Sequence, residues 1–316
     1  MKNNKKIIVL SIVALAVIGL FLSIGVNGTN YQYAMYRRIP KIIAMVLTGA
    51  SIGFSSLLFQ TVTNNRVLTP SILGLDSLYV LLQTAVVFIL GSSSVLISNG
   101  NVNFIITIVV MIAFSAILYK FVFKKGSKNI FTILLIGVIC GTFFECLTSF
   151  MQVLIDPTEF LTVQDKMMAS FNNVNTEILL LSSVVIILSI AYCYDMVKVL
   201  DVMSLGRDEA ISLGVDYDKI SKKILIIVVI LTSVSTALVG PITFLGLLVV
   251  NIARQMINSY KHEVLGLVTI ILSIIALVGG QLIVEHILKF DTTVSVIINF
   301  IGGIYFIYLV MKERNK

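Results

Sequence analysis

The chain has 316 residues, of which 58% are hydrophobic and only 12% are charged, and its formal net charge is +7. The charged fraction is about half that of an average soluble domain, so a soluble fold of this size could not hide so much apolar surface from water. The composition excludes an ordinary soluble enzyme. The basic residues stand in short groups between apolar segments, which argues against a nucleic-acid-binding protein.

An apolar stretch at residues 7–26 follows the lysine-rich residues 2–6. It is longer than the hydrophobic part of a typical signal peptide, and no small-residue cleavage pattern follows it, so we expect an uncleaved first membrane helix. Comparable stretches recur along the chain, and a helix needs roughly 20 apolar residues to cross the hydrocarbon core. We therefore expect an all-α polytopic membrane protein of about ten transmembrane helices, in a single domain over residues 1–316. The expected spans are residues 7–26, 40–62, 71–90, 103–120, 130–154, 177–196, 222–239, 242–259, 264–284 and 293–311.

The distribution of lysine and arginine orients these spans. With both termini in the cytoplasm, 18 of the 23 Lys and Arg residues fall in cytoplasmic segments and 5 in external ones, the bias that membrane proteins show. This bias favours two short passes within residues 222–259, and Gly240-Pro241 supplies the break between them. Because broken helices are tolerated only against protein or a water-filled cavity, we expect Gly240 and Pro241 near a transport pathway.

Two acidic residues fall within expected spans, where ionisable groups are costly and indicate function. Asp76 is expected near the cytoplasmic end of its span, where water can hydrate it. Glu145 falls in the middle of the fifth span, where it either lines a pathway or hydrogen-bonds to a neighbouring helix. The external loop 155–176 is polar, and we expect a short interfacial helix in it. The histidines and cysteines form no group at ligand spacing, so neither a metal site nor a cofactor is expected.

Residues 196–221 form the longest charged loop on the expected cytoplasmic side. Within it, residues 205–214 predict a short helix with a glycine near each end and acidic residues in its first turn, where the helix dipole favours them. Ala210 and Leu213 are expected on one face of this helix. The segment is either a plain surface helix or a rigid element that docks into a partner.

Signatures of soluble enzymes are missing from the sequence. There is no G-x-x-x-x-G-K-[ST] phosphate loop, no H-E-x-x-H and no G-x-S-x-G. The chain is therefore not expected to be an enzyme. If ATP drives transport, the ATPase is a separate polypeptide.

Three stretches, in the right order, resemble the FecCD-type permeases, which import iron-siderophores, haem and vitamin B12. They are Arg38-Ile39-Pro40-Lys41 with Thr48-Gly49-Ala50-Ser51, Gln60, Asn65 and Pro70-Ser71-Ile72-Leu73-Gly74; then Leu205-Gly206-Arg207-Asp208-Glu209-Ala210-Ile211-Ser212-Leu213-Gly214; then Val239-Gly240-Pro241-Ile242-Thr243-Phe244-Leu245-Gly246-Leu247 with Asn251-Ile252-Ala253-Arg254. The sequence departs from the family pattern at Asn64-Asn65-Arg66-Val67-Leu68, at Val250-Asn251 and at Phe290-Asp291-Thr292-Thr293-Val294. The overall pattern resembles the catecholate branch, that of the petrobactin- or anguibactin-like permeases.

The resemblance implies a BtuC-like type II ABC importer permease in a bacterial plasma membrane, which moves a ferric siderophore into the cytoplasm. It implies as partners two ATP-binding cassette subunits, an extracellular or periplasmic binding protein, and a second permease, either another copy or a paralogue. It assigns binding-protein docking to Arg37, Arg38 and Lys41, with contact to lipid headgroups as the alternative. It assigns ATPase coupling to Leu205, Gly206, Glu209, Ala210, Leu213 and Gly214. The pathway residues expected from their own positions are Glu145, Gly240 and Pro241.

Two other functions remain open at this point. An ion-coupled secondary transporter would use Glu145 and Asp76 as proton sites. A haem or vitamin B12 permease would share the family's fold but carry a different chelate.

Overall fold

The computed structural model describes residues 2–26, 31–124, 130–172 and 174–314, and the regular structure in these ranges is helical. The elements in chain order are α1 (Lys2–Ser23), α2 (Tyr31–Val62), the short 3-10 turn η1 (Pro70–Leu73), α3 (Leu75–Leu90), α4 (Val95–Ser98), α5 (Gly100–Lys124), α6 (Ile130–Leu154), α7 (Pro157–Met167), α8 (Thr176–Tyr194), α9 (Val197–Met203), α10 (Arg207–Ser212), α11 (Tyr217–Val239), α12 (Leu245–Met256), α13 (His262–His286) and α14 (Val294–Arg314).

The helices coincide with the expected spans. Within the described residues, eight helices are long and apolar enough to cross a membrane, and the shorter apolar helices α3 and α12 occupy the two remaining positions. The prediction of an all-helical membrane protein with about ten transmembrane segments is therefore confirmed. The short helix expected in the loop 155–176 is present as α7.

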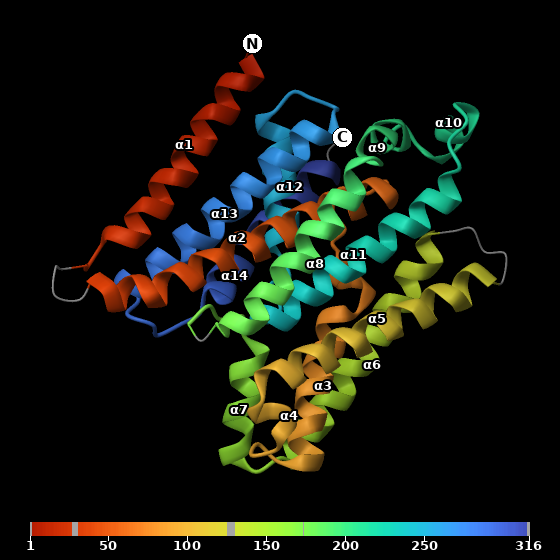
Figure 1. Ribbon diagram of the computed structural model, residues 1–316. Helices are drawn as coiled ribbons and strands as arrows, with labels where there is room; N and C mark the ends of the chain where they lie inside the picture. Colours follow the sequence, from red (N-terminus) through yellow and green to blue (C-terminus); the bar gives the residue numbers. More distant parts are fainter. Residues whose placement is uncertain (1, 27–30, 125–129, 173, 315–316) are drawn as a thin grey trace.

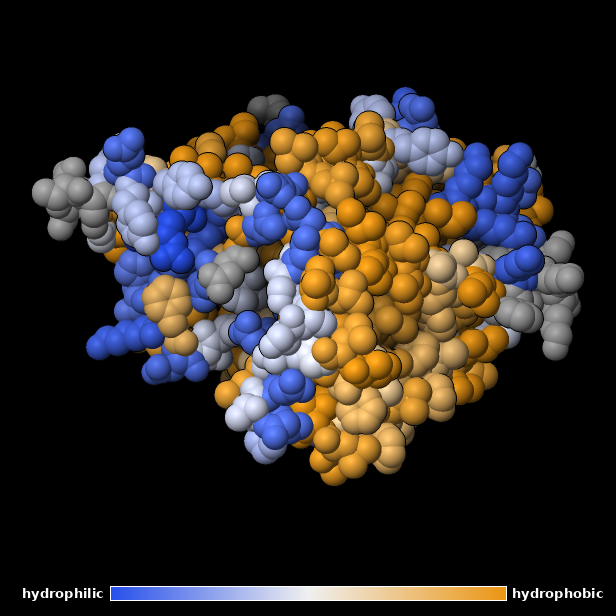
Figure 2. Space-filling model, turned by 60° about the horizontal axis from the view of Figure 1, so that its bottom comes forward, coloured by the Kyte–Doolittle hydropathy of each residue, from blue (hydrophilic) through white to orange (hydrophobic). Residues whose placement is uncertain are grey.

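Two buried helices lie at the centre of the bundle, and more exposed ones surround them. The apolar windows of α2 and α11 are mostly buried, whereas those of α1, α6, α8 and α14 are mostly exposed. Figure 2 shows the result as a broad, continuous hydrophobic surface with hydrophilic side chains gathered beside it. Apolar surface of this extent is unstable in water, so lipid or another subunit must cover it.

The contact between the central helices is made by small hydroxyl side chains. Ser51 of α2 donates a hydrogen bond of 2.7 Å to the carbonyl oxygen of Leu231 in α11. Thr61 of α2 returns its hydroxyl to its own helix, at the carbonyl oxygen of Leu57. Small hydroxyl residues let helices approach closely, and their hydroxyls can bond to backbone carbonyl oxygens where no water is available.

Figure 1 shows the two ends of the bundle. The start of α1, the end of α14, α9 and α10 lie at one end, called here the α10 end, and α4 and α7 lie at the other, the α7 end. The α10 end is tied together by Lys6, whose Nζ donates a 2.6 Å hydrogen bond to the carbonyl oxygen of Met256 at the end of α12. Because the chain starts and finishes at the same end, it crosses the bundle an even number of times.

The two passes between residues 217 and 256 are unequal. α11 has 23 residues and spans the bundle, whereas α12 has 12 residues. At 1.5 Å per residue α12 is about 18 Å long, well short of the ~30 Å hydrocarbon core. The prediction of two passes with a break at Gly240-Pro241 is confirmed. The expectation that both would be short is wrong for α11, because that helix continues beyond the apolar run into the polar residues before it.

A pair of glycines makes α6 the closest neighbour of turn η1. A Cβ atom on Gly137 would lie 2.8 Å from the carbonyl oxygen of Ile72 and 2.9 Å from the Cα of Leu73. One turn later, a Cβ on Gly141 would lie 3.3 Å from the Cα of Gly74. The chain therefore enters α3 along a groove that exists only because these positions of α6 carry no side chain.

This close approach predicts that substitution by alanine changes the free energy of unfolding differently at two glycines. Gly137→Ala should lower the free energy of unfolding by about 1–3 kcal/mol, because backbone must move to admit the methyl group. Gly279→Ala in α13 meets nothing within 4 Å and should be neutral or slightly stabilising. The thermal unfolding midpoints of the two purified variants in one detergent test this, and equal midpoints would contradict it.

Candidate functional site

The predicted functional residues fall into three groups, one at each end of the bundle and one at the level where α3 begins. The group between the ends surrounds a pocket of about 330 Å³, called here the pathway pocket because residues predicted to line a pathway surround it. Its lining residues are Asp76, Ser77 and Val80 from α3, Glu145, Thr148, Ser149 and Gln152 from α6, and Met167, Pro241 and Thr243. The structure thus brings two predicted pathway residues, Glu145 and Pro241, to one place, together with the second intramembrane acid.

Glu145 both lines the pocket and hydrogen-bonds to a neighbouring helix, so the two alternatives for this residue are not exclusive. Its Oε1 accepts a 3.0 Å hydrogen bond from the hydroxyl of Ser77 in α3. The side chain is nevertheless exposed on the surface of the subunit. An exposed carboxylate in the middle of a span cannot face hydrocarbon, so this part of α6 must face water or another protein surface.

Asp76 lies in the first turn of α3, but not at the expected level. Its Oδ1 accepts a 3.4 Å hydrogen bond from the hydroxyl of Thr236, in the last turn of α11. α11 begins beside α10, so its last turn lies toward the opposite end of the bundle. Asp76 is thus at the start of its span, as expected, but the span itself starts inside the bundle, because residues 63–74 carry the chain inward before α3 begins.

Gly240 does not line the pocket but forms the break that shapes it. Its φ of +100° lies in a region that residues with a Cβ rarely adopt. A Cβ there would also lie 2.9 Å from the Cα of Ala169, in the segment that follows α7. The same segment holds the end of α11, since the backbone N–H of Ser170 donates a 2.9 Å hydrogen bond to the carbonyl oxygen of Val239. The break therefore packs against protein, one of the two surroundings in which a broken helix is tolerated.

The predicted docking residues lie at the start of α2, at the α7 end, but they differ in what they contact. Arg38 donates hydrogen bonds of 2.9 and 3.1 Å to the carbonyl oxygens of Phe21 and Leu22, and so caps the last turn of α1. Arg37 is exposed and contacts only Tyr33, one turn earlier in its own helix, among the described residues. Of the two arginines, Arg37 is the one free to meet a partner.

Lys41 is held in a nearly buried ion pair. Its Nζ lies 2.9 Å from Oε1 of Glu285 in α13, and the two side chains are only 13% and 9% exposed. The Nζ also donates to Asn172 at 3.3 Å, and Gln281 donates to both Asn172 and Glu285. Sequence reasoning missed this cluster. The available signal was Glu285, an acid at the end of an apolar stretch and four residues after a glutamine.

The segment 205–214 forms a shorter helix than expected. α10 covers only Arg207–Ser212, and the positive φ of Gly206 (+119°) and Gly214 (+84°) sets its two boundaries. Ala210 is fully buried against the bundle, whereas Leu213 is 64% exposed. The expectation that Ala210 and Leu213 share one face is wrong, because the helix ends before Leu213.

A small apolar surface results at the α10 end. Three large side chains of this segment are exposed, and they are Leu205, Ile211 and Leu213. Ile211 was missed by the sequence reasoning because it is one residue out of register with the expected face. The ion pair between Arg207 and Asp218, at 3.3 Å, ties the start of α10 to the first turn of α11. Among the described residues, no three His, Cys, Asp or Glu side chains come close enough together to hold a metal ion.

Known proteins are similar to this chain in sequence and in fold. The sequence model of the FecCD transport family matches residues 6–312. The chain is 56% identical to the petrobactin import system permease protein YclO of Bacillus subtilis (strain 168) over the full length of both chains. It is 33% identical to the petrobactin import system permease protein FatC of Bacillus anthracis, over 96% of this chain and 88% of that protein. A solved structure of a metal-chelate type ABC transporter in an inward-facing conformation has the same fold, with a TM-score of 0.85 at 22% identity, and the match covers 98% of this chain and 99% of the other.

The contacts of Lys41 and Arg37 predict that their removal affects stability differently. Lys41→Met should lower the free energy of unfolding by roughly 3 kcal/mol, because it leaves the nearly buried carboxylate of Glu285 without its counter-charge. Adding Glu285→Gln should recover part of that loss. Arg37→Met is the matched control and should leave the thermal unfolding midpoint unchanged. Equal midpoints for Lys41→Met and Arg37→Met would show that the ion pair does not stabilise the fold.

Proposed function

The chain belongs to the FecCD transport family, whose sequence model covers residues 6–312, and we propose that it imports a ferric siderophore of the petrobactin type as the permease subunit of an ATP-driven transporter. The single observation that carries this proposal is the 56% identity, over full length, to a permease named for petrobactin import. A second petrobactin permease, at 33% identity, supports the same cargo. Haem and vitamin B12 are less well supported, since neither of these two relatives is named for them.

Three kinds of partner complete the proposed importer. The chain carries no phosphate-binding loop, so ATP hydrolysis falls to separate ATPase subunits, two per transporter, and the chain itself is not an enzyme. A second permease subunit would cover the exposed polar face of α6 around Glu145 and enclose the pathway between the two copies or paralogues. A binding protein would deliver the chelate at the α7 end.

The α7 end is proposed as the external face, with both termini in the cytoplasm. Arg37 and Lys41 line a pocket of about 310 Å³ there, together with Asn172. Exposed Arg37 would guide an acidic lobe of the binding protein electrostatically. Arg38 and Lys41 would contribute by holding α1, α2 and α13 in place, since both are already engaged within the subunit.

The α10 end is proposed as the ATPase-docking face. Exposed Leu205, Ile211 and Leu213 offer an apolar contact, and Ala210 anchors the helix to the bundle. The two glycines define the shape of the segment, because the backbone has positive φ angles at Gly206 and Gly214. Glu209 holds the end of the helix, since its carbonyl oxygen accepts a hydrogen bond from the backbone N–H of Leu213. A rigid helix of this kind would transmit a movement of the ATPase to α9 and α11.

Ion-coupled transport is the rival, because Asp76 and Glu145 share one pocket. The identity to import-system permeases does not favour it. The decisive experiment reconstitutes the permease with its second permease subunit, its ATPase and its binding protein in liposomes and measures uptake of radioactive ferric petrobactin. Uptake should require ATP and persist when an ionophore collapses the proton gradient. Loss of uptake on adding ionophore, with ATP present, would establish the rival instead.

The same assay tests docking and cargo. Arg37→Glu should raise the concentration of binding protein needed for half-maximal uptake, and raising the salt concentration should reduce the difference from wild type. Haem and cobalamin, each offered on its own binding protein, should not be taken up.

The exposed leucine after α10 gives a second prediction. Leu213→Asp should reduce ATP-dependent uptake by about tenfold or more, because it places a charge in an apolar contact with the ATPase. Val95→Asp is the matched control, since Val95 is 70% exposed on α4 at the opposite end. The amount of ATPase that co-purifies with each variant separates lost assembly from lost coupling. Normal uptake by Leu213→Asp would exclude this surface as the coupling site.

A further inference from the structure

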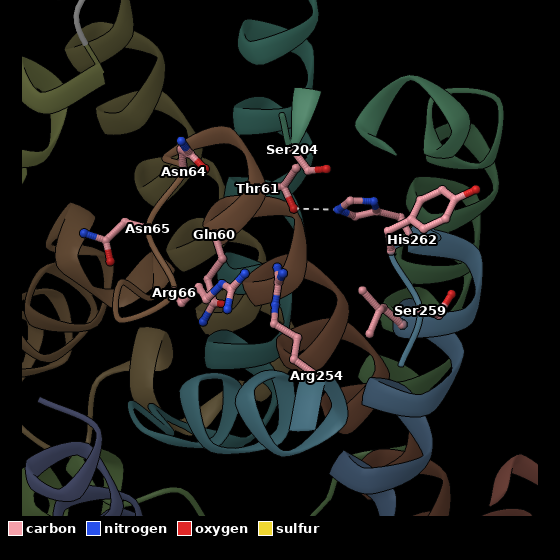
Figure 3. A pocket seen from close by; sticks show the side chains of 11 residues that line it. Gln60, Thr61, Asn64, Asn65, Arg66, Ser204, Arg254, Ser259 and His262 are labelled. Atoms are coloured by element: carbon pink, nitrogen blue, oxygen red, sulfur yellow. Dashed lines mark hydrogen bonds between the residues drawn. The ribbon is translucent and has the colours of Figure 1, made fainter. Parts of the chain in front are cut away.

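A second polar pocket lies at the α10 end and takes no part in the roles described so far. It has a volume of about 280 Å³ and lies where the end of α2, the following turn, the end of α12 and the start of α13 meet. Figure 3 shows that its labelled side chains come from segments far apart in the sequence. The lining residues are Gln60, Thr61, Asn64, Asn65, Arg66, Ser204, Arg254, Ser259, Tyr260, His262 and Leu265.

The pocket is positively charged. Arg66 and Arg254 both extend into it, with their guanidinium groups close together (Figure 3). No aspartate or glutamate lines it, and no ion pair joins either arginine to a carboxylate among the described residues. Two guanidinium groups repel one another in a partly buried site unless an anion lies between them.

Buried polar atoms in the pocket lack partners. Gln60 is only 2% exposed, and neither its amide nitrogen nor its amide oxygen has a hydrogen-bond partner among the described residues. The Nε of Arg254 is likewise buried without a partner. A buried polar group that makes no hydrogen bond destabilises the fold, so these three atoms need hydrogen-bond partners that the described residues do not supply.

The three unpaired atoms specify the chemistry of that ligand. The amide nitrogen of Gln60 and the Nε of Arg254 are donors and need an acceptor, and the positive charges of Arg66 and Arg254 favour an anionic one. The amide oxygen of Gln60 is an acceptor and needs a donor from the same ligand. A protonated phosphate group offers both, whereas sulfate has no hydrogen to donate. Guanidinium groups also match the geometry of phosphate oxygens.

The wall of the pocket is fixed by a chain of hydrogen bonds. His262 contacts Thr61 of α2 through Nε2 at 2.8 Å and Asp201 of α9 through Nδ1 at 2.6 Å. The backbone N–H of His262 also donates to Asp201 at 2.7 Å. The carboxylate of Asp201 is therefore held at His262, and among the described residues it forms no ion pair with Arg66 or Arg254. A ligand in the pocket would contact α2 and α12 directly and α9 through this chain.

We propose that this pocket binds a protonated phosphate group between Gln60, Arg66 and Arg254. The group is either free hydrogen phosphate or the headgroup of a phosphate-monoester lipid such as phosphatidic acid, since both carry the same donor and acceptors. The site is separate from the pathway pocket and does not depend on which chelate the permease carries.

Equilibrium dialysis of the purified full-length permease against ³²P-labelled phosphate tests the proposal, with the thermal unfolding midpoint as a second readout. Phosphate should bind and raise the midpoint, and sulfate at the same concentration should bind about tenfold more weakly or worse. Arg254→Gln should weaken phosphate binding by about tenfold or more. Lys219→Gln, which removes an exposed positive charge at the same end, is the control and should bind like wild type.

The variant Gln60→Leu provides an independent test of the phosphate site if Arg254→Gln fails to fold. It removes the unpaired amide, so it should keep or raise the midpoint without phosphate and lose the shift that phosphate produces. A phosphate shift equal to that of wild type in Gln60→Leu would overturn the proposal, as would equal binding of sulfate and phosphate. Nanodiscs containing phosphatidic acid distinguish the source. Displacement of labelled phosphate there, but not in phosphatidylcholine nanodiscs, would identify the lipid headgroup, and its absence would identify free phosphate.

Discussion

Every backbone polar group must find a partner inside the protein when no water is available, and the break between α11 and α12 is where this requirement shapes the molecule. The carbonyl oxygen at Val239 is satisfied by the N–H of Ser170, and the N–H of Phe244 lies 3.4 Å from the side-chain oxygen of Asn299 in α14. The break can therefore exist only where the segment after α7 and the last helix flank it. The short α12, the pathway pocket and the placement of α14 all follow from that one interruption.

The charged side chains at the α7 end illustrate the same constraint. Arg38 satisfies carbonyl oxygens that the end of α1 leaves free, and Lys41 neutralises the buried carboxylate of Glu285. Their positions beside an aqueous face made both residues good candidates for partner contact. The side chains of Arg38 and Lys41 are long enough, however, to turn back toward the bundle. They do so because the free energy of leaving a buried polar group without a partner exceeds the free energy that hydration of the cation would contribute at the surface. Among the described residues Arg37 contacts only Tyr33 of its own helix, and it stays exposed.

The features that could be predicted from sequence are those that depend on hydropathy and local backbone chemistry. This class contains the positions of the spans, the interruption at Gly240-Pro241 and the glycine boundaries of the 205–214 segment. The level of Asp76 could not be predicted, because it depends on how residues 63–74 enter the bundle between α6 and α11. The partners of Lys41 and the arginine pocket were missed for a similar reason, since they join residues more than 130 positions apart. Such contacts leave no periodicity in the sequence.

A single helix links the two ends of the proposed importer. α11 begins beside α10, where Asp218 pairs with Arg207 and the hydroxyl of Tyr217 donates to the carbonyl oxygen of Val62 at the end of α2. It ends at Thr236 and the break, beside Asp76 and the pathway pocket. A continuous helix of 23 residues transmits displacement instead of absorbing it. In the proposed importer, a displacement of α10 would therefore reach the pathway as movement of the break itself, where Gly240 packs against the segment after α7.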